Sequence, residues 1–312
     1  MRLVAVDGGQ STLRLTVVGS GQVHAGPGFV YRGTDNVPGI VAAVAQAWAG
    51  FTAAASGDPV ARAVLGLTGL PVLESDRERL GAAIAELLPA EEVLLCADNV
   101  TAHAGALGGG PGVALTVGTG VGCLAVRNEV RHRVDGWGHL FGDDGSGFAI
   151  GRAGIAAALR AYDGRGPTTA LLNSTGRRFG APGQLAQVLY TSPTVVDDVA
   201  RFAVEVLDAA AAGDAVAAGI VTAAGGELAR TAAAGIEAIP GSDDVAVAAT
   251  GRLVESGTAL REAFHAALAG VPRARPVPAA GSPLDGACLL ASTPEPLAYL
   301  PLMHRHKHGG FR

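Results

Sequence analysis

The chain has 312 residues, a length that fits about two domains at the usual ~150 residues per domain. Hydrophobic residues make up 49% of the sequence and charged residues 16%, so there is enough apolar material for two buried cores. The formal net charge of −5 and the lack of a Lys/Arg cluster exclude a general binder of nucleic acid or other polyanions.

The cysteines and the N-terminus indicate where the protein works. Cys96, Cys123 and Cys288 are far apart, odd in number and each in an apolar context, which favours buried thiols in a reducing compartment over disulfides or metal ligands. The chain begins directly with a strand, without the basic and apolar segments of a signal peptide. No uninterrupted run of about 18 strongly apolar residues follows. We therefore expect a cytoplasmic protein without a membrane span.

The N-terminal part reads as strands alternating with helices. A buried strand over residues 3–7 leads into Gly8, Gly9, Gln10 and Ser11, here called the first glycine turn, before a second strand over 13–18. Such a hairpin turn can approach a phosphate closely, although Asp-Gly is also a common pair in ordinary hairpins. The pattern then predicts a strand over 22–30, a helix over 37–55, a strand over 60–67, a helix over 75–88 and a strand over 92–97.

Asp98 directly follows the last of these strands, which is fully apolar. Proteins of the α/β class place catalytic groups at the C-terminal ends of buried strands. Asp is also a good helix N-cap, and a helix is predicted over residues 101–107. From position alone, both roles stay open.

A second hairpin of the same kind follows a glycine-rich junction at residues 108–112. Predicted strands over 113–117 and 123–127 flank Gly118, Thr119 and Gly120, here called the second glycine turn. Because strand, glycine turn and strand recur in this way, we expect two duplicated half-molecules that face each other across a cleft. Each turn would offer open backbone donors to phosphate oxygens.

The stretch most crowded with special residues is residues 136–146, here called the acidic loop. It holds Gly136, Trp137, Gly138 and the adjacent carboxylates Asp143 and Asp144, and it enters a helix predicted over residues 148–162. A glycine-rich acidic loop at the start of a helix can face a polar ligand, so we expect this loop to select the substrate. The alternatives to a role in substrate binding are that Asp143 caps the helix and that the Trp137 side chain packs against the protein.

The rest of the chain is mostly helical. We predict helices over 168–174, 183–190, 195–212, 215–239, 253–268 and 282–292, and strands over 245–249 and 275–277. Thr250 and Gly251 follow the first of these strands. The His-rich residues 303–312 are expected to form a solvated tail rather than a metal site.

Taken together, these motifs resemble the sugar-kinase branch of the actin-like ATPase superfamily, and most closely the N-acetylglucosamine kinases of the BadF/BadG-type ATPase family. The resemblance runs in order from residue 3 to about residue 292. Its most specific part is Gly-Trp-Gly-x-x-x-Gly-Asp-(Asp/Glu)-Gly-Ser. The motifs that carry it are Asp7-Gly8-Gly9, Asp98, Gly118-Thr119-Gly120, Gly136-Trp137-Gly138, Gly142-Asp143-Asp144-Gly145-Ser146 and Thr250-Gly251.

The resemblance implies an α/β fold of two ribonuclease-H-like (actin-like ATPase) domains with an interdomain cleft. The first domain would span residues 1–112, completed by the C-terminal helix at about 288–312, and the second would span residues 113–287. It also implies ATP and Mg²⁺ as cofactors, a small sugar as substrate, a homodimer, and no nucleic-acid or membrane partner.

The resemblance also implies a role for each matching residue. Asp98 would be the general base that accepts a proton from the sugar 6-hydroxyl, and Asp7 would lie near Mg²⁺. The sugar site would be lined by Asn36, Thr68, Gly69, Asp98, Gly136, Trp137, Gly138 and Asp143. ATP would be bound by Gly8, Gly9, Gln10, Ser11, Gly118, Thr119, Gly120, Thr250 and Gly251.

Several positions depart from the family pattern and leave alternatives open. Gln10 replaces a glycine, Asp144 stands where Glu is commoner, Val121 replaces a hydroxyl residue, and Phe148-Ala149 replaces Tyr-Trp, which would widen the site. The substrate could therefore be another hexosamine, such as glucosamine or a muramic-acid sugar. A non-catalytic sugar sensor is also possible, whereas an iron–sulfur ATPase would need clustered cysteines, which this sequence lacks.

Overall fold

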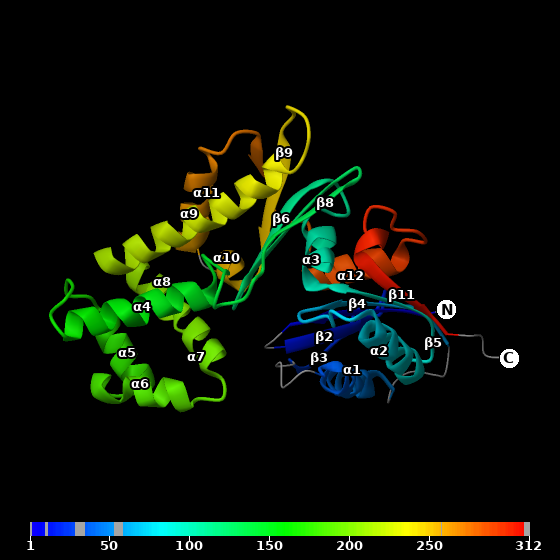
Figure 1. Cartoon of the computed structure of the whole chain (residues 1–312), viewed down its shortest axis with the longest axis horizontal. Coiled ribbons are helices and arrows are strands. Elements are labelled where there is room, and N and C mark those ends of the chain that lie inside the picture. Colours follow the sequence, from blue (N-terminus) through cyan, green and yellow to red (C-terminus); the bar gives the residue numbers. More distant parts are fainter. Residues whose placement is uncertain (1, 10–11, 29–34, 53–58, 257, 309–312) are drawn as a thin grey trace. The chain divides into compact units, whose positions relative to one another are not determined.

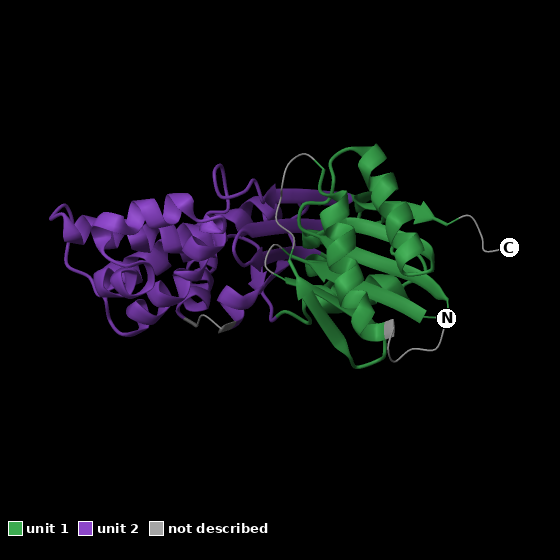
Figure 2. Ribbon diagram, turned by 90° about the horizontal axis from the view of Figure 1, so that it is seen from below, with its two compact units in different colours: residues 1–111, 127–129, 279–312 green, residues 112–126, 130–278 purple. Residues whose placement is uncertain are grey.

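The structure is a computed structural model that describes residues 2–9, 12–28, 35–52, 59–256 and 258–308. The chain divides into two compact units (Figure 2). Unit 1 comprises residues 1–111, 127–129 and 279–312, and unit 2 comprises residues 112–126 and 130–278. The chain thus returns to unit 1 at residue 279, earlier than the boundary near 288 expected from the sequence.

Unit 1 is built on a six-stranded sheet in the order β11-β5-β4-β1-β2-β3 (Figure 1). An antiparallel meander comes first: β1 (Arg2–Gly8), β2 (Thr12–Val17) and β3 (Val23–Pro27). Next, β4 (Val60–Leu67) pairs parallel to β1, and β5 (Ala90–Ala97) pairs parallel to β4. These three strands are rich in Val, Leu and Ala because both faces of a parallel sheet are covered. Because they are parallel, their C-terminal ends lie along the same side of the sheet, here called its C-terminal edge.

Helices cover both faces of this sheet. The side chains of Val4, Val6 and Leu65 alternate toward one face and join the core of α1 (Val37–Thr52) and α2 (Glu74–Leu87). The opposite face carries α3 (Asp98–Ala106) and α12 (Pro283–Ser292), as Figure 1 shows. These two helices pack very closely, because a Cβ at Gly105 would lie 2.0 Å from the Ser282 carbonyl oxygen and one at Gly286 would lie 1.9 Å from that of Thr101.

Unit 2 repeats the same strand plan in a five-stranded sheet with the order β10-β9-β6-β7-β8. The meander consists of β6 (Gly112–Val117), β7 (Val121–Arg127) and β8 (Val130–Asp135). It is extended by β9 (Val245–Thr250), parallel to β6, and by β10 (Ala274–Pro276), parallel to β9. The predicted α/β fold with a duplicated strand arrangement is therefore present.

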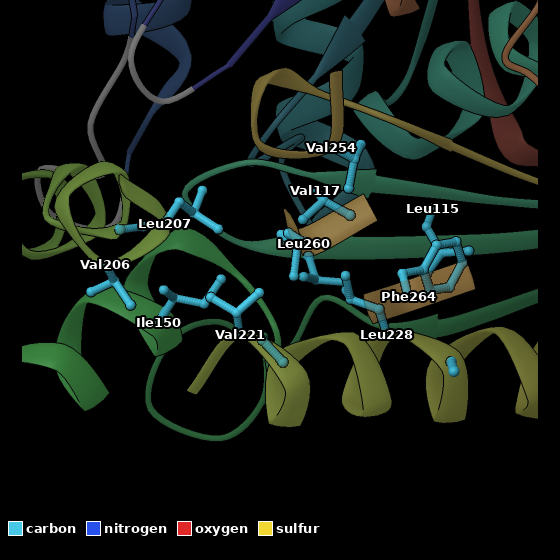
Figure 3. Close-up of a cluster of buried hydrophobic side chains, with 14 of the residues drawn as sticks. Leu115, Val117, Ile150, Val206, Leu207, Val221, Leu228, Val254, Leu260 and Phe264 are labelled. Carbon is cyan, nitrogen blue, oxygen red and sulfur yellow. The ribbon is translucent and has the colours of Figure 1, made fainter. Parts of the chain in front are cut away.

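The helices of unit 2 form its apolar core with the sheet. Side chains from β6, α4, α8, α9, α10 and α11 gather in the cluster drawn in Figure 3. The predicted helix over 195–212 is replaced by two helices, which are separated at the fully buried Phe202. The helices are α4 (Gly147–Tyr162), α5 (Leu171–Phe179), α6 (Pro182–Thr191), α7 (Val195–Arg201), α8 (Ala203–Ala211), α9 (Ala215–Glu237), α10 (Arg252–Ser256) and α11 (Thr258–Leu268).

The prediction of a solvated tail is wrong for residues 303–307. They form β11 (Met303–Lys307), which follows the short 3-10 helix η1 (Leu300–Leu302) and pairs antiparallel with β5. The His304 ring contacts the Glu74 and Glu78 carboxylates of α2 at 2.8 and 3.2 Å, and the His306 ring contacts Glu78 at 2.7 Å. The polar histidines therefore fasten an edge strand to a helix.

Burial of the cysteines agrees with the expectation of small buried thiols. All three are free, and Cys96 and Cys123 are buried. Burial raises the pKa of both thiols above the usual value, which keeps them protonated and unreactive. Cys288 is half-buried.

Within the described residues, no helix by itself has the length and apolar character to cross a membrane. One pair of consecutive segments, Val195–Ala211 and Ala215–Glu237, meets these criteria jointly but is bent by 117°.

Candidate active site

Three of the predicted site residues meet at the C-terminal edge of the unit 1 sheet. Asp7 lies at the end of β1, Thr68 directly follows β4, and Asp98 directly follows β5. The Thr68 N–H donates to the Gly8 carbonyl at 2.8 Å, and the Thr68 hydroxyl donates to the Asp98 carboxylate. One threonine therefore links the first glycine turn to the proposed base.

Asp98 does not act as the helix N-cap that its sequence position also allowed. The helix begins at Asp98 itself, and the cap residue is Ala97, which makes no side-chain cap hydrogen bond. The Asp98 carboxylate accepts the Thr68 hydroxyl, a neighbour from another strand. That contact orients the carboxylate.

Asp7 is a partly buried carboxyl in an electronegative environment. The pKa of Asp7 is raised to about 6, mainly by burial and also by the negative charge of Asp98, while the Arg14 guanidinium acts in the opposite direction. Arg14 Nη1 lies 3.6 Å from Asp7 Oδ2. A bound divalent cation would offset this excess of negative charge. Among the described residues no group of three or more His, Cys, Asp or Glu could hold a metal. A site with only one or two carboxylates fits Mg²⁺, because this ion completes its coordination shell with phosphate and water.

The other predicted residues of unit 1 lie around this edge or outside the described part. The Gly9 N–H donates to the Thr12 carbonyl at 3.0 Å, which closes the first glycine turn. Gln10 and Ser11 lie outside the described residues. Gly69 follows Thr68 with φ +74°, a left-handed conformation that favours glycine. Asn36 precedes α1, and its carbonyl accepts the Ile40 N–H at 3.1 Å.

In unit 2 the second glycine turn and the Thr250-Gly251 pair share one sheet edge, because β6 and β9 are parallel neighbours. Gly251 has φ +109°, and a Cβ there would lie 2.3 Å from the Val117 carbonyl oxygen, so glycine is required. The Thr250 hydroxyl and the Gly251 N–H donate to the Glu255 carboxylate at 3.0 and 2.9 Å. Glu255 was not predicted as a site residue, although an acidic residue in the first turn of a helix after Thr-Gly is a recognisable signal.

The second glycine turn is also hydrogen-bonded to the start of α4. The Gly147 N–H donates to the Gly118 carbonyl at 2.8 Å, and the Phe148 N–H donates to the Thr119 carbonyl at 3.1 Å. The helix cap is Ser146, whose hydroxyl accepts the Ala149 N–H at 3.2 Å. The alternative that Asp143 caps this helix is therefore wrong.

Asp143 instead lies folded into the acidic loop and is buried. Its carboxylate accepts the N–H groups of Val121 and Gly138, and its own N–H donates to Asp135 Oδ1 at 3.0 Å. Burial raises the pKa of the Asp143 carboxyl, and the two backbone donors act in the opposite direction. Asp135, the last residue of β8, was not predicted because that strand itself was not.

Trp137 is exposed and does not pack in the core. Its side chain is 69% exposed, and the Arg133 guanidinium lies 5.3 Å from the ring centroid, within the range of a cation–π contact. The flanking residues Gly136 and Gly138 have φ values of +72° and +84°, so the backbone turns sharply on both sides of the ring. The loop thus presents an aromatic face to solvent.

The chain is similar to a protein named N-acetylmuramic acid/N-acetylglucosamine kinase from Clostridium acetobutylicum, with 40% identity over 81 residues. The aligned stretch covers 26% of this chain and 26% of that kinase, about a quarter of each protein.

Solved structures match almost the whole chain. A Chromobacterium violaceum protein, provisionally described as an N-acetylglucosamine kinase, is 25% identical with a TM-score of 0.69, covering 93% of this chain and 99% of that one. A Porphyromonas gingivalis protein with the same provisional description shares the fold at 15% identity and a TM-score of 0.71, with the same coverage. A glucokinase of the ROK family from Streptomyces griseus shares it at 19% identity and a TM-score of 0.58, again over 93% and 99%.

A family model matches residues 6–291, which include both glycine turns, Asp98 and the acidic loop. The chain therefore belongs to the BadF/BadG/BcrA/BcrD ATPase family.

Proposed function

We propose that this protein is an ATP-dependent sugar kinase that phosphorylates the 6-hydroxyl of N-acetylglucosamine. The observation that carries the proposal is the Asp98 carboxylate, oriented by the Thr68 hydroxyl at the sheet edge that also holds Asp7. The relatives named as N-acetylglucosamine kinases support a hexosamine as the substrate class.

The proposed chemistry uses the carboxylate as a general base. Asp98 accepts the proton of the sugar hydroxyl as its oxygen attacks the γ-phosphorus of ATP, and ADP leaves. Asp7 would hold Mg²⁺, which neutralises charge on the phosphates when bound. Burial and, to a smaller extent, the negative charge of Asp98 raise the pKa of Asp7, and the nearby charge of Asp98 supports a cation at the site.

Backbone groups of both glycine turns are proposed to bind the phosphates, through Gly8, Gly9, Gln10 and Ser11 in unit 1 and Gly118, Thr119 and Gly120 in unit 2. Within the described residues the Thr119 N–H has no hydrogen-bond acceptor, which supports a donor role at the tip of the second turn. Thr250 and Gly251 are proposed to contact adenosine at the same edge of the unit 2 sheet.

Sugar recognition is assigned to Asn36, Thr68 and Gly69 in unit 1 and to Gly136, Trp137, Gly138 and Asp143 in unit 2. The exposed Trp137 ring supports this assignment, because aromatic faces pack well against the apolar faces of sugar rings. The apolar side chains of Leu140 and Phe141 are 73% and 86% exposed on the same loop.

A second candidate substrate is N-acetylmuramic acid. It is favoured by the name of the Clostridium acetobutylicum relative and by Ala149, a small residue beside the acidic loop. The proposal further includes a homodimer and a cytoplasmic location.

A coupled ADP-release assay over a panel of hexoses and N-acetylhexosamines, with Mg²⁺, tests the proposal. We expect turnover with N-acetylglucosamine and loss of at least about 100-fold in kcat in Asp98→Asn, because base catalysis contributes ~10²–10⁴-fold. Sugar binding should remain measurable in Asp98→Asn. Retained turnover in that variant would remove Asp98 from the role of base.

A further inference from the structure

The second glycine turn and the acidic loop meet at the carboxylate of Asp143. One N–H donor comes from Val121, the first residue of β7 after the turn, and the other comes from Gly138 in the loop. The Asp143 side chain is only 8% exposed. A single buried carboxylate therefore accepts a hydrogen bond from each of the two segments.

The backbone of Asp143 is fixed as firmly as its side chain. Its φ of +61° is left-handed, a conformation that Asp adopts more readily than most residues other than glycine. Its N–H donates to Asp135 at 3.0 Å, and its carbonyl accepts the Ser146 N–H at 3.1 Å. These backbone contacts fix the position of Asp143 relative to the start of α4.

Gly120 leaves the space that this carboxylate occupies. A Cβ at Gly120 would lie 2.5 Å from Asp143 Oδ2, 3.0 Å from Cγ and 3.4 Å from Oδ1, and these are its three nearest heavy atoms. The backbone of Gly120 is outside the left-handed region, so its conformation does not itself require glycine. The contact with Asp143 accounts for glycine at this position.

We infer that Asp143 is a positioning residue that holds the phosphate turn and the sugar loop as one hydrogen-bonded unit. The inference rests on the proposed function for the identity of the two ligands. Its consequence is that each segment affects the other's ligand. A change in the phosphate turn at Gly120 weakens sugar binding, and a change at Asp143 weakens nucleotide binding.

Calorimetric titration tests this crossed dependence, using N-acetylglucosamine without nucleotide and ADP without sugar. Gly120→Ala should weaken N-acetylglucosamine binding roughly tenfold, a typical size for coupling between sites. Gly219→Ala is the matched control in α9 of the same unit, because a Cβ there meets nothing within 4 Å, and it should leave sugar binding unchanged. Equal sugar affinity in the two variants would overturn the inference.

The reciprocal titration uses Asp143→Asn and ADP. The amide keeps one acceptor oxygen but presents N–H groups where the second backbone donor points, so nucleotide affinity should fall roughly tenfold. An ADP affinity equal to that of the unsubstituted protein would contradict the inference, because a residue that touches sugar alone would leave it unchanged.

A double variant tests whether the methyl group introduced by Gly120→Ala acts through its contact with Asp143. In Gly120→Ala combined with Asp143→Ala, the Gly120 substitution should cost little further affinity for ADP, because its clashing partner is gone. Additive losses would mean that Gly120→Ala acts through some other contact, and the inference would fail.

Amide hydrogen exchange tests, without any ligand, whether Asp143 holds the second glycine turn and the acidic loop together. Asp143→Ala should speed exchange at both Val121 and Gly138, with exchange along α9 unchanged. Unchanged exchange at both amides would overturn the inference. If the unsubstituted protein bound neither N-acetylglucosamine nor ADP, the proposed function would fail. The exchange rates at Val121 and Gly138 would still show whether Asp143 holds the two segments together.

Discussion

Two carboxylates lie at one edge of the unit 1 sheet in unequal surroundings. Asp98 accepts the Thr68 hydroxyl, whereas Asp7 is partly buried beside the charge of Asp98, and the Arg14 guanidinium lies 3.6 Å from its carboxylate. A carboxyl whose pKa is raised on folding favours the folded state in its protonated form. Asp7 therefore lowers stability at neutral pH, which is a common cost of a functional group.

Asp7→Asn should be more stable than the unsubstituted protein at pH 7.5 by up to about 3 kcal/mol, in the absence of Mg²⁺ and nucleotide. The pKa of Asp7 is raised from 3.8 to about 6, so its stabilising contribution is complete below pH 3.8 and is lost as the pH rises through about 6. The advantage of the variant should therefore shrink between pH 7.5 and pH 5. Urea unfolding at both pH values measures it.

The control for this experiment is Asp244→Asn, which changes an exposed carboxylate in the loop before β9. It should show no advantage that depends on pH. An advantage of Asp7→Asn that is the same at pH 5 and pH 7.5 would contradict the account of Asp7.

Thr68→Val should lower kcat roughly 10- to 100-fold, because a hydrogen bond to a charged group contributes ~1.5–3 kcal/mol. The valine keeps the shape of the side chain but cannot donate to Asp98. Thr68→Ser keeps the donor and should retain most of the rate. Steady-state kinetics should show the loss mainly in kcat, with a much smaller change in the KM for sugar. A fully active Thr68→Val would show that the hydroxyl does not orient the base.

At the residue scale, sequence patterns could locate the charged groups but not their partners. Asp98 was a candidate because it directly follows an apolar strand, whereas a role for Asp7 was implied only by the family resemblance. Thr68 was expected to border the sugar, but its donation to Asp98 joins residues 30 positions apart and depends on the register of β4 with β5. The role of Asp143 was likewise hidden, because its donors come from Val121 and Gly138.

At the element scale, the strands that were missed are those without an apolar pattern. The strands β8 and β11 contain Arg131, His132 and Arg133, and His304, Arg305 and His306, and both lie at sheet edges. An edge strand has one open side, so polar residues are tolerated and the alternation that reveals a strand is lost. The buried strand β4 was predicted at the bounds observed, because its apolar run is continuous.

The close contact between α3 and α12 predicts a sensitive position. Gly286→Ala should destabilise the protein by about 1–3 kcal/mol, because the new Cβ would overlap the Thr101 carbonyl of the helix that begins at Asp98. The variant should also lose activity as α3 shifts. Thermal unfolding and kcat measure the two effects.

Gly39→Ala is the matched control, because Gly39 lies in α1 and a Cβ there meets nothing within 4 Å. It should be neutral or stabilising by up to about 1 kcal/mol, since alanine favours a helix over glycine. If Gly286→Ala were as stable as this control, the close packing of the two helices would not constrain position 286.

At the scale of the whole molecule, the duplication is the feature that the sequence revealed best. Two hairpins with glycine turns recur, and each begins a sheet of the same strand order, β4 and β5 in unit 1 corresponding to β9 and β10 in unit 2. The chain returns to unit 1 at Ala279, within a stretch rich in Pro, Ala and Gly that links β10 to α12. Contacts such as Ala280 N–H to the Ala106 carbonyl, at 2.9 Å, decide that boundary.

Identification of the reaction product tests the central claim most directly. The protein would be incubated with ATP, Mg²⁺ and N-acetylglucosamine, and the sugar product examined by ³¹P NMR and mass spectrometry. The account predicts N-acetylglucosamine 6-phosphate in amounts equal to the ADP formed. ATP left intact with every amino sugar tested, or phosphate released to water without a sugar phosphate, would contradict it.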